Sequence, residues 1–156
     1  EAKVKPASAY IIDLLSSGVE KLVVGAWHRD VIQDITDRIR SAGYVVARYE
    51  SGASPEKRQG AIDRFQDGDA HVIIGNLKSM GTGITLTAAH HQVLVESNWS
   101  PGDLYQWSDR CHRIGQTKSV TIDVLTVHES IDEHVLRRIL EKKEVTEQCL
   151  PVDVAP

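Results

Sequence analysis

Short apolar runs alternate with amphipathic segments along most of the chain. Runs rich in β-branched residues predict buried strands at 21–27, 44–49, 71–76, 92–97 and 120–127. In the stretch 28–43, Val31, Ile35 and Ile39 recur at helical spacing before Gly43, which predicts an amphipathic helix. Strands that alternate with helices at such short intervals are typical of βαβ units. We therefore expect a parallel sheet that is covered on both faces.

Further helices are predicted at 7–18, after an initial loop in 51–68, at 100–115 and at 130–150. Ser54 is a suitable N-cap for the second of these, with Pro55 at its first position, and Ser130 and Glu133 form a capping box for the last. The Gly/Thr-rich stretch 77–91 has no regular period and predicts a connection. The polar ends, 1–6 and 151–156, are expected to be tails of a single domain covering 1–156. Functional groups are expected in the loops after 27, 49, 76 and 97, at the carboxyl ends of the strands.

Composition narrows the function classes. With 41% hydrophobic and 26% charged residues, the chain is typical of a soluble globular domain, and no apolar run suggests a membrane partner. A net charge of −4 provides no overall basic surface, so nucleic acid would be bound by local donors or through a partner domain. The two cysteines, Cys111 and Cys149, lack CxxC spacing. This pattern favours a reducing, intracellular setting without a disulfide framework, and no metal site is expected.

The segment 106–116, "QWSDRCHRIGQ", has an unusual density of polar groups. If it is helical, Gln106, Arg110 and Arg113 share one face, because they are spaced by four and three residues. Two neighbouring guanidiniums repel each other, but they suit a polyanion that binds between them, such as the phosphates of a phosphoryl-transfer reaction. The alternative is a solvated helix face on which Asp103 and Asp109 pair with the arginines. Spacing alone favours this alternative.

Two other stretches contain candidate phosphate ligands. In "KSMGTGITLT" (78–87), Gly81 and Gly83 permit close backbone approach, and hydroxyls are supplied by Ser79, Thr82, Thr85 and Thr87. Such groups could hold a nucleic-acid backbone without reading bases, although the segment lacks the ending of a P-loop. In "RYESGASPEKR" (48–58), Gly52 precedes a predicted helix N-terminus, which is a possible anion site. The alternatives are a flexible connection for the first stretch and a plain turn for the second.

Taken together, these motifs resemble those of the Snf2 family of helicase-like ATPases. "QWSDRCHRIGQ" resembles motif VI, Gln-x-x-Asp-Arg-x-His-Arg-Ile-Gly-Gln, at all its specified positions, and "GTGITLTAAHHQVLVESNWSPGDLYQ" resembles motif V and the segment that joins it to motif VI. "KLVVGAWHRDV" stands where motif IV does, and "ARYESGASPEKRQGAIDRF" resembles an Arg-x-Asp-Gly-Ser element followed by a helix. The resemblance extends from about Lys21 to Glu144. It implies a RecA-like three-layer α/β sandwich, with a mostly parallel sheet of five to six strands and helices on both faces.

The family's motor has two such lobes, and this chain resembles only the second. ATP binds in the cleft between the lobes, and DNA runs across both. The resemblance therefore implies one lobe of a DNA-dependent ATPase or translocase, with ATP and Mg²⁺ bound mainly by the N-terminal lobe of the same protein and with double-stranded DNA as partner. We expect the isolated lobe to be inactive and monomeric. We expect the intact protein to be intracellular, and nuclear if it is eukaryotic or cytoplasmic if it is prokaryotic.

The resemblance also implies roles for individual residues. Arg110 and Arg113 would be arginine fingers that reach ATP, and Gln106 would position the γ-phosphate or the attacking water. Gly83 and Thr85 would belong to the ATP-binding surface. The residues that would contact the DNA backbone are Ser79, Gly81, Thr82, Gly52, Ser51 and His28.

The chain departs from the family pattern at three places. Glu50-Ser51-Gly52 stands where the family usually has Asp-Gly-Ser, and Thr85 replaces the usual Asn, as in the annealing-helicase branch. Trp107 replaces a small residue and is expected to pack locally. Two alternative functions remain: a free-standing nucleic-acid-binding module, which the acidic balance disfavours, and the matching lobe of another superfamily 2 helicase. RNA-directed members of that superfamily typically have Gly-Arg-x-x-Arg where this chain has "HRIGQ".

Overall fold

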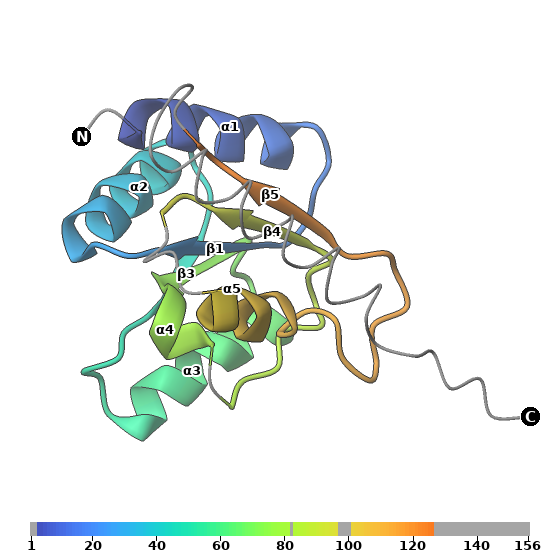
Figure 1. The fold of residues 1–156 in the computed structure, drawn as a ribbon. Coiled ribbons are helices and arrows are strands. Elements are labelled where there is room, and N and C mark those ends of the chain that lie inside the picture. Colours follow the sequence, from blue (N-terminus) through green and yellow to red (C-terminus); the bar gives the residue numbers. More distant parts are fainter. Residues whose placement is uncertain (1–2, 82, 97–100, 127–156) are drawn as a thin grey trace, which may run out of the picture. The chain divides into compact units, whose positions relative to one another are not determined.

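A five-stranded parallel sheet forms the centre of the fold (Figure 1). The computed structural model describes residues 3–81, 83–96 and 101–126. The strands, in the spatial order β2-β3-β1-β4-β5, are β1 (Leu22–Ala26), β2 (Val46–Tyr49), β3 (Val72–Asn76), β4 (His91–Leu94) and β5 (Thr121–Val124). Every neighbouring pair is parallel. All the predicted strands are confirmed, as is the α/β fold class.

Five helices occur within the described part of the chain, and three of them differ from prediction. They are α1 (Val4–Ser16), α2 (Arg29–Ser41), α3 (Pro55–Gln66), α4 (Leu77–Met80) and α5 (Pro101–Ser108). Because α1 begins at Val4, the expectation of a tail over 1–6 is wrong for residues 4–6. The short helix α4 was not predicted. Ser54 caps α3 as expected, with its hydroxyl oxygen 3.3 Å from the backbone N of Lys57.

The chain divides into two compact units, Glu1–Leu125 and Thr126–Pro156, and all the elements above belong to the first. The predicted helix at 130–150 and the tail at 151–156 lie outside the described residues. The single domain over 1–156 therefore stays a prediction. Among the residues that the structure covers, no helix has the length and apolar character needed to cross a membrane.

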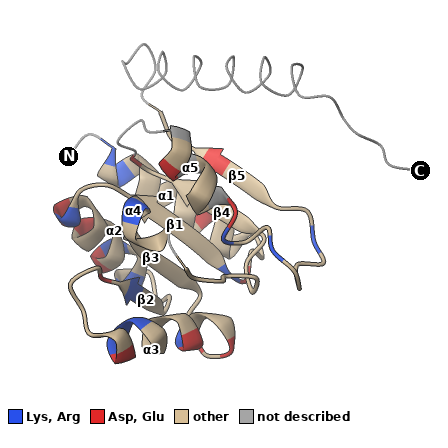
Figure 2. Ribbon diagram, turned by 60° about the horizontal axis from the view of Figure 1, so that its bottom comes forward, with Lys and Arg blue, Asp and Glu red and all other residues tan. Residues whose placement is uncertain are grey.

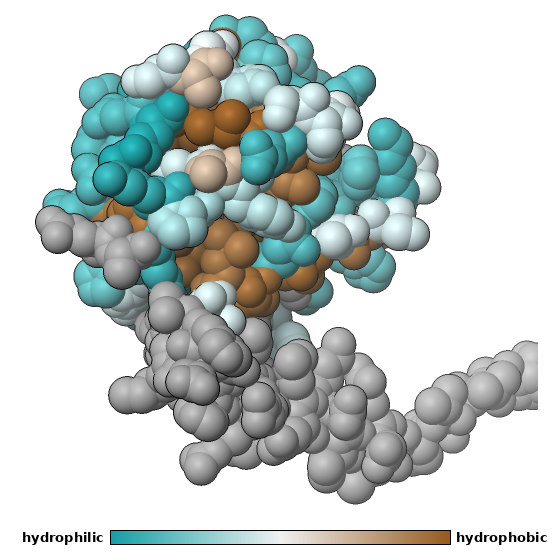
Figure 3. All heavy atoms as spheres, turned by 90° about the horizontal axis from the view of Figure 1, so that it is seen from above, coloured by the Kyte–Doolittle hydropathy of each residue, from teal (hydrophilic) through white to brown (hydrophobic). Residues whose placement is uncertain are grey.

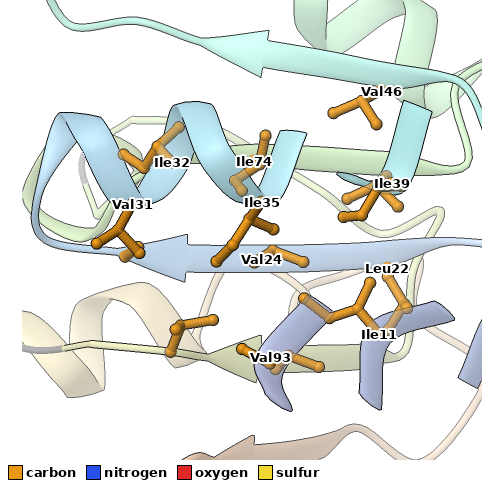
Figure 4. Close-up of a cluster of buried hydrophobic side chains, with 14 of the residues drawn as sticks. Ile11, Leu22, Val24, Val31, Ile32, Ile35, Ile39, Val46, Ile74 and Val93 are labelled. Atoms are coloured by element: carbon orange, nitrogen blue, oxygen red, sulfur yellow. The ribbon is translucent and has the colours of Figure 1, made fainter. Parts of the chain in front are cut away.

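Side chains of the sheet alternate between two hydrophobic clusters, which gives the fold three layers. On one face, Ile11 of α1 and the isoleucines of α2 pack against Leu22 and Val24 of β1 (Figure 4). On the other face, α3, α4 and α5 cover Val23 and Ile73. Strands that are buried on both faces account for the near-continuous apolar runs in the sequence.

The outer surface shows where apolar groups reach solvent. Viewed from above, the face of α1 and α2 shows brown apolar residues among teal hydrophilic ones (Figure 3). In the described part of the chain, lysines and arginines are interleaved with acidic residues (Figure 2). This distribution agrees with the absence of an overall basic surface in the composition, so any anion site must be local.

Candidate functional site

The segment that follows α5 is not helical, which corrects one prediction. Helix α5 ends at Ser108, so Gln106, Arg110 and Arg113 do not share a helix face. In a longer helix the carbonyl oxygen of Gln106 would accept the backbone N–H of Arg110. Here it accepts the Nε of the Arg110 side chain, at 2.6 Å, while the Arg110 backbone N–H bonds to the carbonyl of Trp107. The arginine thus competes for the bond that would have continued the helix.

Arg110 joins the segment after α5 to the connection between β3 and β4. Its side chain is buried, with 7% of its surface exposed, and its Nη1 donates to the carbonyl oxygen of Ile84 at 3.3 Å. Its own carbonyl oxygen accepts the backbone N–H of Leu86 at 3.0 Å. Burial lowers the pKa of the Arg110 guanidinium, and Arg113 lowers it further, while Asp109 acts in the opposite direction. A buried cation is thus held mainly by backbone carbonyl oxygens.

Arg113, in contrast, is exposed to solvent. Its Nη1 donates to the hydroxyl oxygen of Thr85 at 3.2 Å, which links two of the stretches predicted to carry chemistry. A hollow of about 670 Å³ lies beside this pair and is lined by Thr85, His112, Arg113, Ile114, Gln116 and Lys118. The structure therefore brings Arg113 and Thr85 together on an open surface and places Arg110 beneath it.

The side chain of Gln116 was not predicted to have a role. Its Nε2 lies 2.7 Å from the carbonyl oxygen of Ala89 and 3.3 Å from those of Thr87 and Cys111. Its Oε1 accepts the backbone N–H of Lys118 at 3.0 Å. Hydrogen bonds of Gln116 therefore hold the end of the segment 106–116 against the β3–β4 connection. The only sequence signal for this residue is its match to the last position of motif VI, because its partners lie up to 29 residues away.

Gly81 and Gly83 lie in the β3–β4 connection, and the structural reason for a glycine differs between the two positions. Gly83 has a φ of +70°, a conformation that side chains disfavour, whereas Gly81 ends α4 with an ordinary φ of −71°. A Cβ on Gly81 would lie 3.2 Å from the carbonyl oxygen of Leu77 and 3.8 Å from Cβ of Gln106. Gly81 thus lies beside Gln106, which is exposed on α5. Ser79 is half-buried on α4, and Thr82 lies outside the described residues.

A second hollow, of about 340 Å³, lies at the carboxyl ends of β2 and β3. The residues that line it are Arg29, Ile32, Arg48, Tyr49, Glu50, Ser51, Gly52 and Asn76. Ser51 and Gly52 were predicted to contact the DNA backbone, whereas no such contact was predicted for Arg29 and Arg48. Arg48 bonds to the Gln33 side-chain oxygen, and its Nη2 lies 3.1 Å from Oε1 of Glu50. Its Nε is buried without a hydrogen-bond partner.

His28 stands apart from that hollow. It precedes α2, and its backbone N–H and its ring Nδ1 both lie within hydrogen-bond distance of Oε2 of Glu96, at 3.2 Å and 3.1 Å. Glu96 follows β4, so this contact joins the loops after two neighbouring strands. His28 is therefore paired with a carboxylate in this structure.

Trp107 packs locally, as expected from the sequence. Its side chain is completely buried, and a Cβ on Gly25 of β1 would lie 3.0 Å from its ring carbons. The glycine therefore makes room for the indole, which anchors α5 on the sheet. The indole Nε1 has no hydrogen-bond partner. Cys111 is also completely buried, and burial raises the pKa of its thiol to about 12.

Comparisons with known proteins agree with this arrangement. The family model described as the helicase conserved C-terminal domain matches residues 6–115. The "SWI/SNF-related matrix-associated actin-dependent regulator of chromatin subfamily A-like protein 1" of Xenopus laevis is 36% identical over 150 residues, which cover 96% of this chain and 16% of that protein. The human "DNA annealing helicase and endonuclease ZRANB3" is 33% identical, with coverage of 96% and 14%.

A solved structure extends the likeness to three dimensions. The C-terminal part of the Fun30 ATPase domain superposes with a TM-score of 0.77 and 26% identity, covering 86% of this chain and 44% of that one. The chain therefore belongs to the helicase C-terminal domain family, as a C-terminal lobe of the Snf2 type. It spans about one sixth of the length of the curated relatives it matches.

Proposed function

We propose that this chain is the C-terminal motor lobe of an ATP-dependent Snf2-type DNA translocase and that it supplies an arginine finger for ATP hydrolysis. The observation that carries the proposal is the exposed guanidinium of Arg113, oriented by Thr85 from the other motif. A guanidinium has five N–H donors in a rigid fork, and the bond to Thr85 uses one of them. Within the described residues the remaining donors have no partner, so they could meet phosphate oxygens presented by a facing lobe.

The residues around Arg113 fit ATP bound mainly elsewhere. Lys118 lines the same hollow and adds positive charge, whereas no carboxylate among the described residues lines it to hold a metal. Mg²⁺ would therefore be held with the nucleotide by the N-terminal lobe. When bound, the nucleotide supplies the phosphoryl group for transfer. The part of this chain is to neutralise the charge on that group through Arg113, with Gly83 and Thr85 shaping the surface.

The two arginines are not equivalent in this proposal. Arg110 is buried and already donates to two carbonyl oxygens, so we assign it a positioning role. Both arginines were expected to act as fingers, whereas the proposal assigns this role to Arg113 alone. The positive charge of Arg110 still adds to the potential behind Arg113. Gln106, exposed on α5 beside Gly81, remains the proposed group for positioning the γ-phosphate or the attacking water.

We assign the DNA track to the loops at the carboxyl ends of the strands. Ser79, Gly81 and Thr82 would contact the backbone of double-stranded DNA after β3, and Ser51 and Gly52 would do so after β2. Arg29 and Arg48 strengthen the second site, because they line the same hollow. Such contacts position a duplex without reading its sequence. We leave His28 as a weaker candidate because of its contact with Glu96.

The partner of the lobe would be the N-terminal RecA-like lobe of the same protein. Closure around ATP brings Arg113 to the phosphates, and cycles of closure and opening would step the lobes along DNA. Thr85 and the similarity to the human protein named as an annealing helicase favour that branch of the family. An intracellular location follows from this function.

The decisive experiment replaces Arg113 with Ala in the intact two-lobe protein. We expect DNA-stimulated ATP hydrolysis to fall by about 10³-fold or more, the range of arginine-finger effects, with duplex binding largely retained. Arg64→Ala is the matched control, because Arg64 is exposed on α3 and pairs only with Asp69 within the described structure. Near-normal hydrolysis by the Arg113 variant would contradict the proposal, as would measurable turnover by the purified 156-residue chain.

A further inference from the structure

The most exposed apolar side chain in the described part of the chain lies next to the proposed arginine finger. Ile114 is fully exposed, at 103% of its reference surface, whereas the other exposed large apolar residues, Tyr105 and Ile122, are each at 39%. Ile114 lies at the tip of a turn in which the backbone N–H of Gln116 donates to the carbonyl oxygen of Arg113 at 2.9 Å. Gly115 has a φ of +103°, as the third position of a type II turn requires.

The turn is fixed at both ends, so Ile114 is held out by the fold. Arg113 bonds to Thr85 before the tip, and after it the side chain of Gln116 lies within hydrogen-bond distance of Thr87 and Ala89. A fully exposed isoleucine contributes almost no burial to the stability of its own lobe. A hydrogen-bonded turn that presents such a side chain beside two cations offers an apolar centre with a charged rim, which is the composition of a protein interface.

The surroundings of Ile114 indicate the chemistry of that partner. Ile114 lines the same hollow as the cations Arg113 and Lys118. This combination suits a facing surface that places an apolar pocket next to anions, with Ile114 as the buried centre and the cations at the rim. Phosphates held by a facing lobe would supply the anions.

We propose that Ile114 is an apolar anchor that docks into the N-terminal lobe of the same protein when the two lobes close on ATP. This inference rests on the proposed function, because it uses the closed state that Arg113 is proposed to complete. Docking buries Ile114 only in the closed state, so its side chain favours closure. The energy of burying Ile114 is therefore added to the contact that Arg113 makes with the phosphates.

The test compares Ile114→Ser with Ile122→Ser in the intact protein. Full burial of an isoleucine corresponds to roughly 10- to 100-fold in an equilibrium, so we expect kcat/KM for ATP to fall by about that factor in the Ile114 variant. Duplex affinity measured without nucleotide should stay unchanged, and Ile114→Leu should restore most of the loss. Ile122→Ser, which alters an exposed isoleucine on β5, should leave kcat/KM for ATP unchanged. In the 156-residue chain, Ile114→Ser should leave the unfolding midpoint unchanged.

Four results would overturn the inference. An unchanged kcat/KM in Ile114→Ser, together with loss of hydrolysis in Arg113→Ala, would reject the anchor and keep the proposed function. A lower unfolding midpoint of the 156-residue chain would show that Ile114 serves its own lobe. A dimer of that chain that Ile114→Ser dissociates, measured by sedimentation, would identify a second copy as the occupant. Normal hydrolysis in Arg113→Ala would reject the proposed function and the anchor together.

Discussion

Removing the side chain of Arg110 should destabilise the lobe, whereas removing that of Arg113 should not. Arg110→Ala leaves the carbonyl oxygens of Gln106 and Ile84 without their present donors, at a buried position. Arg113→Ala removes one bond to an exposed hydroxyl. The two substitutions change the same residue type three positions apart, so the difference between them reports the tertiary environment alone.

The structure sets the size of the effect. A hydrogen bond from a charged donor contributes about 1.5–3 kcal/mol, and the bond to Gln106 is short at 2.6 Å. The bond to Ile84 is longer, at 3.3 Å, and contributes less. Removal of a buried cation and of its repulsion by Arg113 offsets part of the loss. We therefore expect Arg110→Ala to lower the free energy of unfolding by about 2 kcal/mol, and Arg113→Ala by no more than about 0.5 kcal/mol.

Urea denaturation of the 156-residue chain, followed by circular dichroism, measures both values. Equal losses for the two variants, or a loss below about 0.5 kcal/mol for Arg110→Ala, would refute the positioning role of Arg110. Arg110→Lys is an additional control, because it keeps the charge but loses the planar fork that reaches both carbonyl oxygens. It should fall between the wild-type chain and Arg110→Ala.

Three further predictions follow from the packing of the lobe. Gly25→Ala should lower the free energy of unfolding by about 1–3 kcal/mol, because the added Cβ would lie 3.0 Å from the ring of Trp107. A double-mutant cycle in denaturant should show a smaller loss when the same substitution is made in a Trp107→Phe background. Gly83→Ala should lower the free energy of unfolding by about 1 kcal/mol, measured in the same way, because of the φ of +70°. In a Cys149→Ser background, Cys111 should resist thiol reagents at neutral pH until the chain is unfolded, because burial raises its pKa to about 12. The folded-state pKa of Cys111 lies above the unfolded value of about 8.5, so the stability that the buried thiol contributes is fully present below about pH 8.5. This stability is lost as the pH rises toward 12. Denaturation curves recorded at several pH values should show a loss of up to about 1.4 kcal/mol per pH unit.

The positions of the strands along the chain and the cap of α3 could be predicted because they depend on neighbouring residues. Runs such as 21–27 and 71–76 are apolar and rich in β-branched residues, and Ser54 precedes Pro55 at a helix start. The end of α5 could not be predicted in this way. It depends on the side chain of Arg110, which occupies the carbonyl of Gln106 and is itself bonded to Ile84, 26 residues earlier.

In the candidate site, too, some features could be predicted from the sequence and others could not. The motif in 106–116 identified Arg113 and Arg110 as a pair, but Arg110 is buried and Arg113 is exposed, a difference that the motif does not encode. Arg29 and Arg48 were missed because they belong to different elements and meet only where β2 and α2 approach the same hollow. Gln116 was missed because its partners are backbone carbonyls, which carry no residue-specific pattern.

The sequence alone thus determined the alternation of strands and helices, the parallel α/β fold and the motifs of the family. These properties arise from apolar periodicity and from residue types at short spacing. The tertiary structure decided that Arg110 is buried, that Arg113, the proposed finger, is exposed, and that Ile114 is exposed next to Arg113. The reason is physical. Exposure and hydrogen-bond partners at 106–116 depend on how the β3–β4 connection packs against that segment, and no local pattern contains that information.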